Sequence, residues 1–366
     1  MHLLPVLLLC ILATVGRADW RVALPGWKYE FPRDHGNHPE FKTEWWYFSG
    51  NLTAEDGRAF GYQLTFFRQG VMPVDADIIP LSRFVTSSVK LAHFAISDIS
   101  GERFRFFQKL SRGAYGEAGF DRDSKLAWIE DWSCVLGDGG VFRIRANADD
   151  FGLELTLKPA KPLVIHGRDG VSQKSEGQGR ASHYYSFTRL SSEGLLRVGD
   201  QRFAMSGSSW FDHEWATNQL AANQVGWDWL GLQLDDGSDL MLIHFRTKNG
   251  EPDPNSSGTF VDARGLATPL SSSDFSFDPM ETWVSGQTKA KYPIGWQIVI
   301  PRLNLRLEVG SALKDQELRL KPVAYWEGSV RANGTTAQGE VKGSGYLEMT
   351  GYAEAMAEIR AQPEGH

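Results

Sequence analysis

The sequence predicts an all-β protein made of two tandem antiparallel β-barrel domains. Apolar residues alternate with polar or small ones over residues 60–66 and again over residues 230–234, which is the period of a half-buried strand. Asp56-Gly57 and Asp236-Gly237 lie beside these runs, and Asp-Gly pairs are strong signals of tight hairpins. The chain also contains 13 Trp, 21 Phe and 38 Gly, a composition that favours strands over long helices.

The first residues have the features of an export signal. Leu3 to Val15 is an apolar run, too short for a bilayer-spanning helix of about 20 residues. Gly16 and Ala18 are the small residues expected before a cleavage site that follows Ala18. We therefore expect residues 1–18 to be a signal peptide, the protein to be periplasmic or secreted, and the mature chain to have no transmembrane span. Because Met1-His2 carries no Lys or Arg, an uncleaved N-terminal anchor is the alternative.

The two halves of the remaining chain open and close alike. Residues 46–50 lead into the first Asp-Gly pair and an alternating strand, just as residues 227–231 lead into the second. Residues 207–212 and 343–348 share their pattern of Gly, Ser, an aromatic and a final acid. Chance likeness between Trp- and Gly-rich strands is the alternative, but agreement at both ends favours a duplication. We predict domains over residues 28–215 and 226–352, and about eight strands in each would close a barrel around one small ligand.

Composition excludes several classes of function. The chain has 366 residues, a net charge of -7 and no basic block, so it is a poor candidate for nucleic-acid binding. Cys10 and Cys134 are its only cysteines, too few for a disulfide framework or a Cys-based zinc site. An apolar fraction of 42% is typical of a globular protein rather than a disordered one.

Several longer motifs resemble one known family. They are Phe31-Pro32-Arg33-Asp34-His35-Gly36, Thr43-Glu44-Trp45-Trp46-Tyr47, Ser186-Phe187-Thr188-Arg189-Leu190, Trp210-Phe211-Asp212-His213-Glu214-Trp215, Gly226-Trp227-Asp228-Trp229 and Tyr325-Trp326-Glu327-Gly328. Over residues 28–352 the chain resembles the AttH-like family, which is related to carotenoid 1,2-hydratases and often labelled predicted secreted hydrolases. The resemblance implies two lipocalin-like (calycin-type) β-barrel domains. It also implies a possible association with a transport system, because family members are found near transport genes.

The segment from Trp210 to Trp215 contains the strongest candidate site. On a strand, Asp212 and Glu214 face one side and His213 the other. Burial of a carboxyl among aromatic rings favours its neutral form, which suits a general acid. The alternative is that Asp212 and Glu214 form ion pairs with Arg residues across the domain junction. The resemblance adds His213 and Trp215, because a His-x-Trp pair is implicated in catalysis by the carotenoid hydratases.

A second candidate lies at the first strand of the second half. Asp228 stands between Trp227 and Trp229, and the resemblance implies a catalytic Asp near an aromatic residue in this region. The structural alternative is a cap on the loop before the strand. Trp46 and Tyr47 are the first-half counterparts and complete the predicted ligand-binding set with Trp215, Trp227 and Trp229.

No cofactor or metal is expected from the motifs. Asp34, His35 and His38 have ligand side chains but lie in a Pro-flanked loop, and no His-x-His or His-Glu-x-x-His spacing occurs. The sequence also lacks a phosphate-binding loop, a dinucleotide fingerprint and the Gly-x-Ser-x-Gly elbow of serine hydrolases.

Two hypotheses of function follow. In the first, the chain is a hydratase or hydrolase for a hydrophobic, isoprenoid or polyene-like small molecule. Asp212 or Asp228 would protonate the substrate, His213 would act as the base or as an orienting group, and the faces of Trp215, Trp227 and Trp229 would stabilise a carbocation. In the second, the chain is a non-catalytic lipocalin-like carrier or a transporter-associated accessory protein, with the same Trp residues lining a pocket. The first hypothesis expects Asp212, His213, Trp215 and Asp228 to converge at a cleft between the barrels.

Overall fold

The fold was obtained as a computed structural model, which describes residues 19–73, 86–121, 123–250, 252–321 and 323–354. The predicted signal peptide over residues 1–18 lies outside these ranges. Strands dominate, and the helical turns there are the short 3-10 segments Arg33–His35, Ala114–Gly116, Asp138–Gly140 and Pro301–Leu303. Among the described residues, no helix has the length and apolarity needed to cross a membrane.

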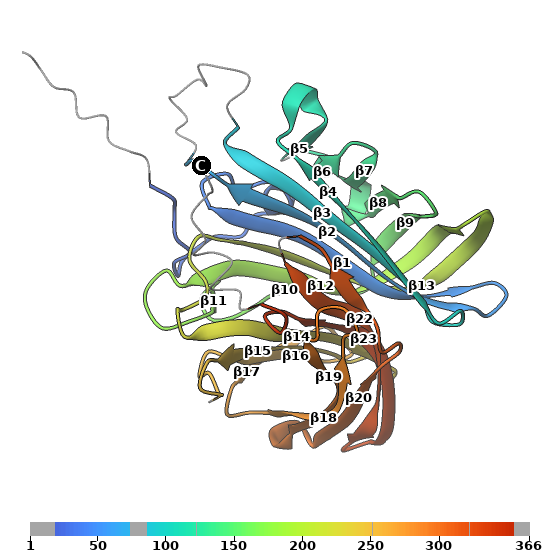
Figure 1. The fold of residues 1–366 in the computed structure, drawn as a ribbon. Coiled ribbons are helices and arrows are strands. Elements are labelled where there is room, and N and C mark those ends of the chain that lie inside the picture. Colours follow the sequence, from blue (N-terminus) through green and yellow to red (C-terminus); the bar gives the residue numbers. More distant parts are fainter. Residues whose placement is uncertain (1–18, 74–85, 122, 251, 322, 355–366) are drawn as a thin grey trace, which may run out of the picture.

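The first sheet has 13 strands, which pair antiparallel. They are β1 (Thr43–Ala54), β2 (Ala59–Gly70), β3 (Ser88–Asp98), β4 (Arg103–Ser111), β5 (Ala118–Phe120), β6 (Lys125–Ile129), β7 (Trp132–Leu136), β8 (Phe142–Asn147), β9 (Phe151–Pro159), β10 (Val164–Ile165), β11 (Ser172–Gln173), β12 (Ala181–Val198) and β13 (Gln201–Ala216). The order is β4-β3-β2-β1-β13-β12-β9-β8-β7-β6-β5, with β10 and β11 paired to β12. The closing strand β13 therefore lies beside the opening strand β1, and the sheet curls into a near-barrel (Figure 1).

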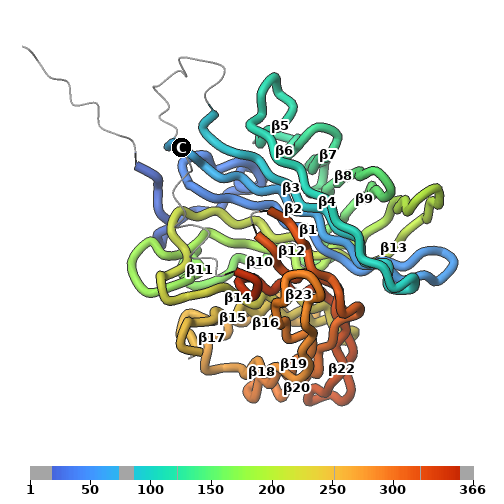
Figure 2. Tube along the Cα trace, viewed as in Figure 1, coloured from blue at the N-terminus to red at the C-terminus, as the bar shows by residue number. Residues whose placement is uncertain are grey.

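The second sheet has ten strands. They are β14 (Gln224–Leu234), β15 (Asp239–Thr247), β16 (Ser257–Val261), β17 (Ala267–Ser271), β18 (Ser276–Val284), β19 (Lys291–Ile300), β20 (Leu305–Ser311), β21 (Glu317–Arg319), β22 (Ala324–Thr336) and β23 (Gly339–Met349). Their order is β17-β16-β15-β14-β23-β22-β20-β19-β18, with β21 paired to β22. This sheet forms a half-barrel packed against the first (Figures 1 and 2). The predicted fold class is confirmed, whereas the domain limits 28–215 and 226–352 stay a prediction.

Both predicted hairpins form, and their turns correct one detail of the internal repeat. Gly57 and Gly237 adopt φ values of 85° and 86°, in the left-handed region that Gly accepts without steric cost. Alignment on these turns gives an offset of 180 residues, so Trp227 corresponds to Tyr47 and not to Trp46. A shift of one residue reverses the face of a strand, and the structure follows the turns: Tyr47 and Trp227 both pack between the sheets.

Most of the buried apolar side chains fall into three compartments. The first interior lies inside the first sheet and includes Trp46, Phe211 and Trp215. The second interior lies inside the second sheet and includes Leu230, Leu232 and Trp326. The junction lies between the sheets and includes Tyr47, Trp210 and Trp229. Because strand side chains alternate between faces, β13 contributes to both the first interior and the junction.

A buried ion-pair cluster joins the two sheets. Asp239, at the start of β15, is fully buried. Its carboxylate accepts hydrogen bonds from the Lys161 ammonium at 2.7 Å and the Arg189 guanidinium at 2.6 Å, both supplied by the first half of the chain. The Thr188 hydroxyl also donates to this carboxylate, at 2.8 Å. Since removal of one partner from a buried ion pair leaves an uncompensated charge, this cluster makes separation of the sheets costly.

Candidate functional site

Asp212 places its carboxyl in the junction, where three side chains donate hydrogen bonds to it. The Tyr184 hydroxyl donates to Oδ2 at 2.7 Å, and the Trp210 indole N–H donates to Oδ1 at 2.6 Å. The Ser186 hydroxyl also donates to Oδ1. Ser186 stands directly opposite Asp212 in the pairing of β12 with β13. No cation among the described residues forms an ion pair with this carboxyl.

Burial controls the protonation of this carboxyl. Asp212 is only 4% exposed, and desolvation raises its pKa to about 7 even though the hydrogen bonds from Ser186, Tyr184 and Trp210 act in the opposite direction. The nearby charge of Glu214 raises the pKa further. A carboxyl with a pKa close to the working pH can both donate and accept a proton, which is the property required of a general acid or base.

Three further carboxyls lie in the junction, where Glu214 and Glu327 are buried and Glu348 is half-buried. Glu348 on β23 accepts a hydrogen bond from the Trp227 indole at 3.0 Å, and burial, with the charges of Asp212 and Glu214, raises its pKa to about 7. Burial and the charge of Glu348 raise the pKa of Glu327 well above its usual range. Glu214 differs, because the Lys174 ammonium lies 2.8 Å from its carboxylate. Within the described part of the chain, Glu214 is the member of this acidic group that has a cation partner.

A chain of polar side chains extends from Asp212 to the second sheet. His166 Nε2 lies 2.7 Å from the Ser186 hydroxyl, and His166 Nδ1 lies 2.9 Å from the Thr259 hydroxyl on β16. Burial lowers the pKa of His166 to about 3, so its imidazole is neutral. Since Ser186 donates to the carboxylate, Nε2–H donates to Ser186 and Nδ1 accepts from Thr259. The chain therefore has a single direction of hydrogen bonding, toward Asp212.

His213 belongs to a different network, in the first interior. Its Nε2 lies 3.0 Å from Glu44 Oε1, and His38 Nδ1 lies 2.7 Å from the same oxygen. The Arg68 guanidinium donates to Glu44 Oε2 at 3.2 Å. Burial alone would raise the pKa of Glu44, but the His38 charge, the hydrogen bonds from His213 and His38, and the Arg68 charge hold it well below its usual range. Glu44 is thus the buried anion of a fully paired cluster.

The same cluster brings together three potential metal ligands. Ligand atoms of His38, Glu44 and His213 all lie within 4.8 Å of one another. Burial would lower the pKa of His38, but Glu44 and Asp34 raise it overall, and a protonated imidazole has no lone pair for a metal. Arg68 already supplies a cation to the carboxylate. The donor set is therefore better matched to an ion-pair network than to a metal, and we assign no metal to it.

Aromatic rings enclose His213 on the interior side of β13. Its ring centroid lies 4.7 Å from Trp46 and 5.0 Å from Trp215, and the ring of His38 stacks on Trp215 at 3.8 Å. The Trp46 indole donates to the His35 carbonyl at 2.9 Å. These contacts fix the N-terminal loop against the strands and fill this end of the first interior.

Comparison with known proteins identifies the family. A family model for AttH-like proteins matches residues 22–352. The chain belongs to the AttH-like family. The crystal structure of an AttH protein from Nitrosomonas europaea is 33% identical with a TM-score of 0.81, and the match covers 91% of this chain and 99% of that one.

One structural neighbour and one sequence relative are named for the addition or removal of water. Kievitone hydratase from Nectria haematococca has a similar fold, with a TM-score of 0.68 at 16% identity, covering 89% of this chain and 93% of that one. The dehydratase asqC of Emericella nidulans is 22% identical over 277 residues, which is 70% of this chain and 75% of that protein. The AttH-like chain therefore shares its fold with a hydratase and has a dehydratase relative.

In this AttH-like chain the predicted site residues do not converge. His213, Trp215 and Trp46 lie in the first interior; Asp212, Glu214, Tyr47, Trp227 and Trp229 lie at the junction; Asp228 lies on the interior side of the second sheet. The expected meeting of Asp212, His213, Trp215 and Asp228 at one cleft is wrong. Alternation along β13 separates Asp212 from His213, and alternation along β14 separates Asp228 from its Trp neighbours.

Asp228 is held by a cation in the second half. It is fully buried, forms an ion pair with Arg246 on β15, and lies 3.2 Å from His244 Nδ1. The Tyr352 hydroxyl lies 3.1 Å from Oδ1. These partners satisfy the carboxylate, and it neither faces Asp212 nor caps the preceding loop. The Arg pairing considered for Asp212 and Glu214 is therefore found at Asp228 instead.

Sequence reasoning missed Tyr184, Ser186, His166 and Glu348 as members of the AttH-like junction site. Ser186 stands in a motif that carried the family resemblance, but its position opposite Asp212 depends on the pairing of β12 with β13. Glu348 had a detectable signal, since the internal repeat matched residues 207–212 with 343–348 and so matched Asp212 with Glu348. Both acids lie at the junction with raised pKa values.

Proposed function

We propose that this chain is a hydratase-type enzyme that adds water to, or removes it from, a hydrophobic small molecule, with Asp212 as the proton donor. The observation that carries the proposal is the environment of Asp212: a buried carboxyl with three hydrogen-bond donors, no ion pair with a described cation, and a pKa near 7. The names of the two distant relatives support water addition or removal as the type of reaction.

The junction supplies the parts that such a reaction needs. Protonated Asp212 gives its proton to an alkene carbon, and the hydrogen bonds from Tyr184 and Ser186 stabilise the carboxylate that remains. The Trp210 and Trp229 rings, with centroids 5.9 Å apart in an edge-to-face arrangement, offer aromatic faces to the resulting carbocation. Water adds to the cation, and the Glu348 carboxylate accepts its proton. The reverse sequence removes water from the alcohol.

His213 and Trp215 have a supporting role in this proposal. They lie on the opposite face of β13 from Asp212, and their partners are Glu44, His38 and Trp46. They fix the strand that presents Asp212, and they do not touch the substrate. A substrate site inside the first sheet would instead make turnover depend directly on His213.

Oxygen-isotope incorporation tests the reaction. The purified protein is incubated with kievitone or with squalene, a linear isoprenoid alkene, in water enriched in ¹⁸O, and products are examined by mass spectrometry. A product heavier by one labelled water is expected from the native protein and from the control Asp278→Asn, an exposed position on β18. The Asp212→Asn variant should form it at least about 100-fold more slowly, the usual contribution of a general acid.

The same experiment separates the alternatives. Full activity of Asp212→Asn together with loss in His213→Asn would place the chemistry in the first interior. Binding of the alkene without any labelled product in the native protein would favour the carrier hypothesis.

We also propose that the protein is exported, on the basis of residues 1–18. The intact mass of the exported protein should correspond to a chain that begins at Asp19. A product that retains Leu3 to Val15 would indicate an uncleaved anchor.

A further inference from the structure

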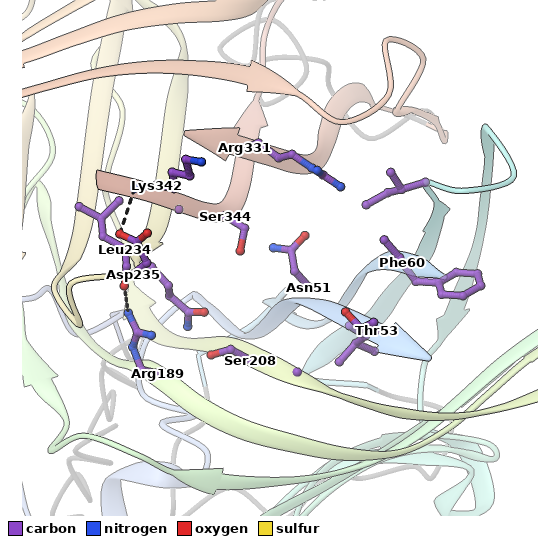
Figure 3. Close-up of a pocket in the computed structure, with 16 residues that line it drawn as sticks. Asn51, Thr53, Phe60, Arg189, Ser208, Leu234, Asp235, Arg331, Lys342 and Ser344 are labelled. Carbon is purple, nitrogen blue, oxygen red and sulfur yellow. Dashed lines mark hydrogen bonds between the residues drawn. The ribbon is translucent and has the colours of Figure 1, made fainter. Parts of the chain in front are cut away.

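A groove opens at one end of the contact between the two sheets (Figure 3). Its volume is about 530 Å³, within the usual range for small-molecule sites. The first sheet contributes β1, β2 and β13 to its walls, and the second sheet contributes β14, β22 and β23. The groove is separate from the filled interior around His213.

Positive charge predominates on the side of the second sheet. Arg331 on β22 and Lys342 on β23 both line the groove and are exposed. Neither side chain forms an ion pair with any residue that the structure describes. Asp235 supplies one carboxylate, which accepts the backbone N–H of Lys342 at 3.0 Å. Arg189 also lines the groove, but its charge is paired with Asp239. Two cations thus remain for one acid.

The opposite wall offers a hydroxyl and apolar surface. Ser208 Oγ has no hydrogen-bond partner in the described structure, although the atom is buried from solvent. Asn51 is already occupied, because its amide donates to the Gly345 carbonyl at 3.1 Å. Ile99, which is half-buried, provides apolar surface on this side. An occupant with one anionic end and an apolar body would match both walls.

The groove leads toward Asp212. A second, small gap of about 10 Å³ shares Asn51, Ser208 and Gln233 with the groove, and the Trp210 ring forms part of its wall. The Trp210 indole donates to Asp212. One indole ring therefore separates the acidic carboxyl from the space next to the groove.

We propose that the groove binds the substrate through a carboxylate held by Arg331 and Lys342, with the apolar chain directed toward Trp210. The substrate class is thus an apolar molecule with a terminal acid group. The anion site stands on the groove alone, whereas the direction of the chain rests on the proposed function of Asp212.

Two retinoids form a matched pair of probes, because retinoic acid and retinol share the polyene chain and differ in the terminal group. Their binding is measured by quenching of the Trp fluorescence of the mature protein. Two exposed cations contribute about tenfold in affinity together, so the native protein should bind the acid about tenfold more tightly than the alcohol. The double variant Arg331→Gln/Lys342→Gln should lose this preference and bind retinol as before.

Controls keep the two proposals distinguishable. Lys291→Gln removes an exposed cation on β19 outside the groove and should leave the preference intact. Asp212→Asn should also retain it, since failure of the acid chemistry leaves the anion site in place. Equal affinity of the native protein for both retinoids, or an unchanged preference in the double variant, would overturn the proposal. Displacement of retinoic acid by micromolar inorganic phosphate would also overturn it, because the groove would then be a site for a free anion.

Discussion

Replacement of Asp212 by Asn tests, through stability as well as activity, whether burial raises the pKa of Asp212. Asn has nearly the same shape but cannot ionise. Its NH2 group takes the place of one oxygen that now accepts from Ser186, Trp210 or Tyr184, so one hydrogen bond must rearrange, at a cost of about 1 kcal/mol. The larger effect is on the pH dependence of the free energy of unfolding.

The sign follows from the raised pKa. Folding raises the pKa of Asp212 from its ordinary value of 3.8 to about 7, so the folded state binds this proton more tightly than the unfolded state. The stabilisation is complete below pH 3.8 and is lost as pH rises toward 7. Between about pH 5 and pH 8 the native protein should lose about 2 to 3 kcal/mol that the Asp212→Asn variant does not lose.

Urea unfolding at pH 5 and pH 8 measures this difference from the midpoints and slopes of the transitions. Asp278→Asn, at an exposed position, serves as the matched control and should follow the native protein. An identical pH dependence in the native protein and in Asp212→Asn would show that burial does not raise the pKa of Asp212. The acid role would then lose its physical basis.

Three further variants or reactions examine neighbouring groups. Glu348→Gln should likewise lose less stability than the native protein as pH rises, because burial raises the pKa of Glu348 to about 7; a steeper loss in urea titrations would contradict this. Glu44→Gln leaves Arg68 without its buried anion and should destabilise the protein by about 3 to 5 kcal/mol, seen as a lower thermal midpoint by circular dichroism, whereas an unchanged midpoint would argue against the network. Burial raises the pKa of the Cys134 thiol, so iodoacetamide should label it only after unfolding; rapid labelling of the native protein would show that the thiol is accessible.

The sequence was sufficient to predict the all-β class, both hairpins and the opposite faces of Asp212 and His213, because these depend on local alternation. The expected eight or so strands in each half were wrong, since the sheets have 13 and ten strands and the second closes only half a barrel. The sequence was not sufficient to predict which residues surround Asp212. Ser186 lies opposite Asp212 because β12 pairs with β13. Asp228 lies away from Asp212 because its side chain is on the face of β14 that points into the second sheet. These positions are decided by pairing between segments far apart in the chain.

Local similarity also misled at one point. The similar runs that begin at Trp46 and Trp227 match these two residues, but the hairpin turns align Tyr47 with Trp227. An offset of one residue moves a side chain from the barrel interior to the junction. Turn positions are therefore a better reference for alignment than aromatic residues in strands of this kind.

Asp212 is on the first sheet and Glu348 is on the second. Contact between the two sheets is therefore linked to the binding of protons by these acids. Each acid is kept from water only while β13 and β23 face the junction, and separation would return both pKa values to about 4. At neutral pH, opening of this contact would release protons and closing would take them up. Acid therefore tightens the contact and base loosens it.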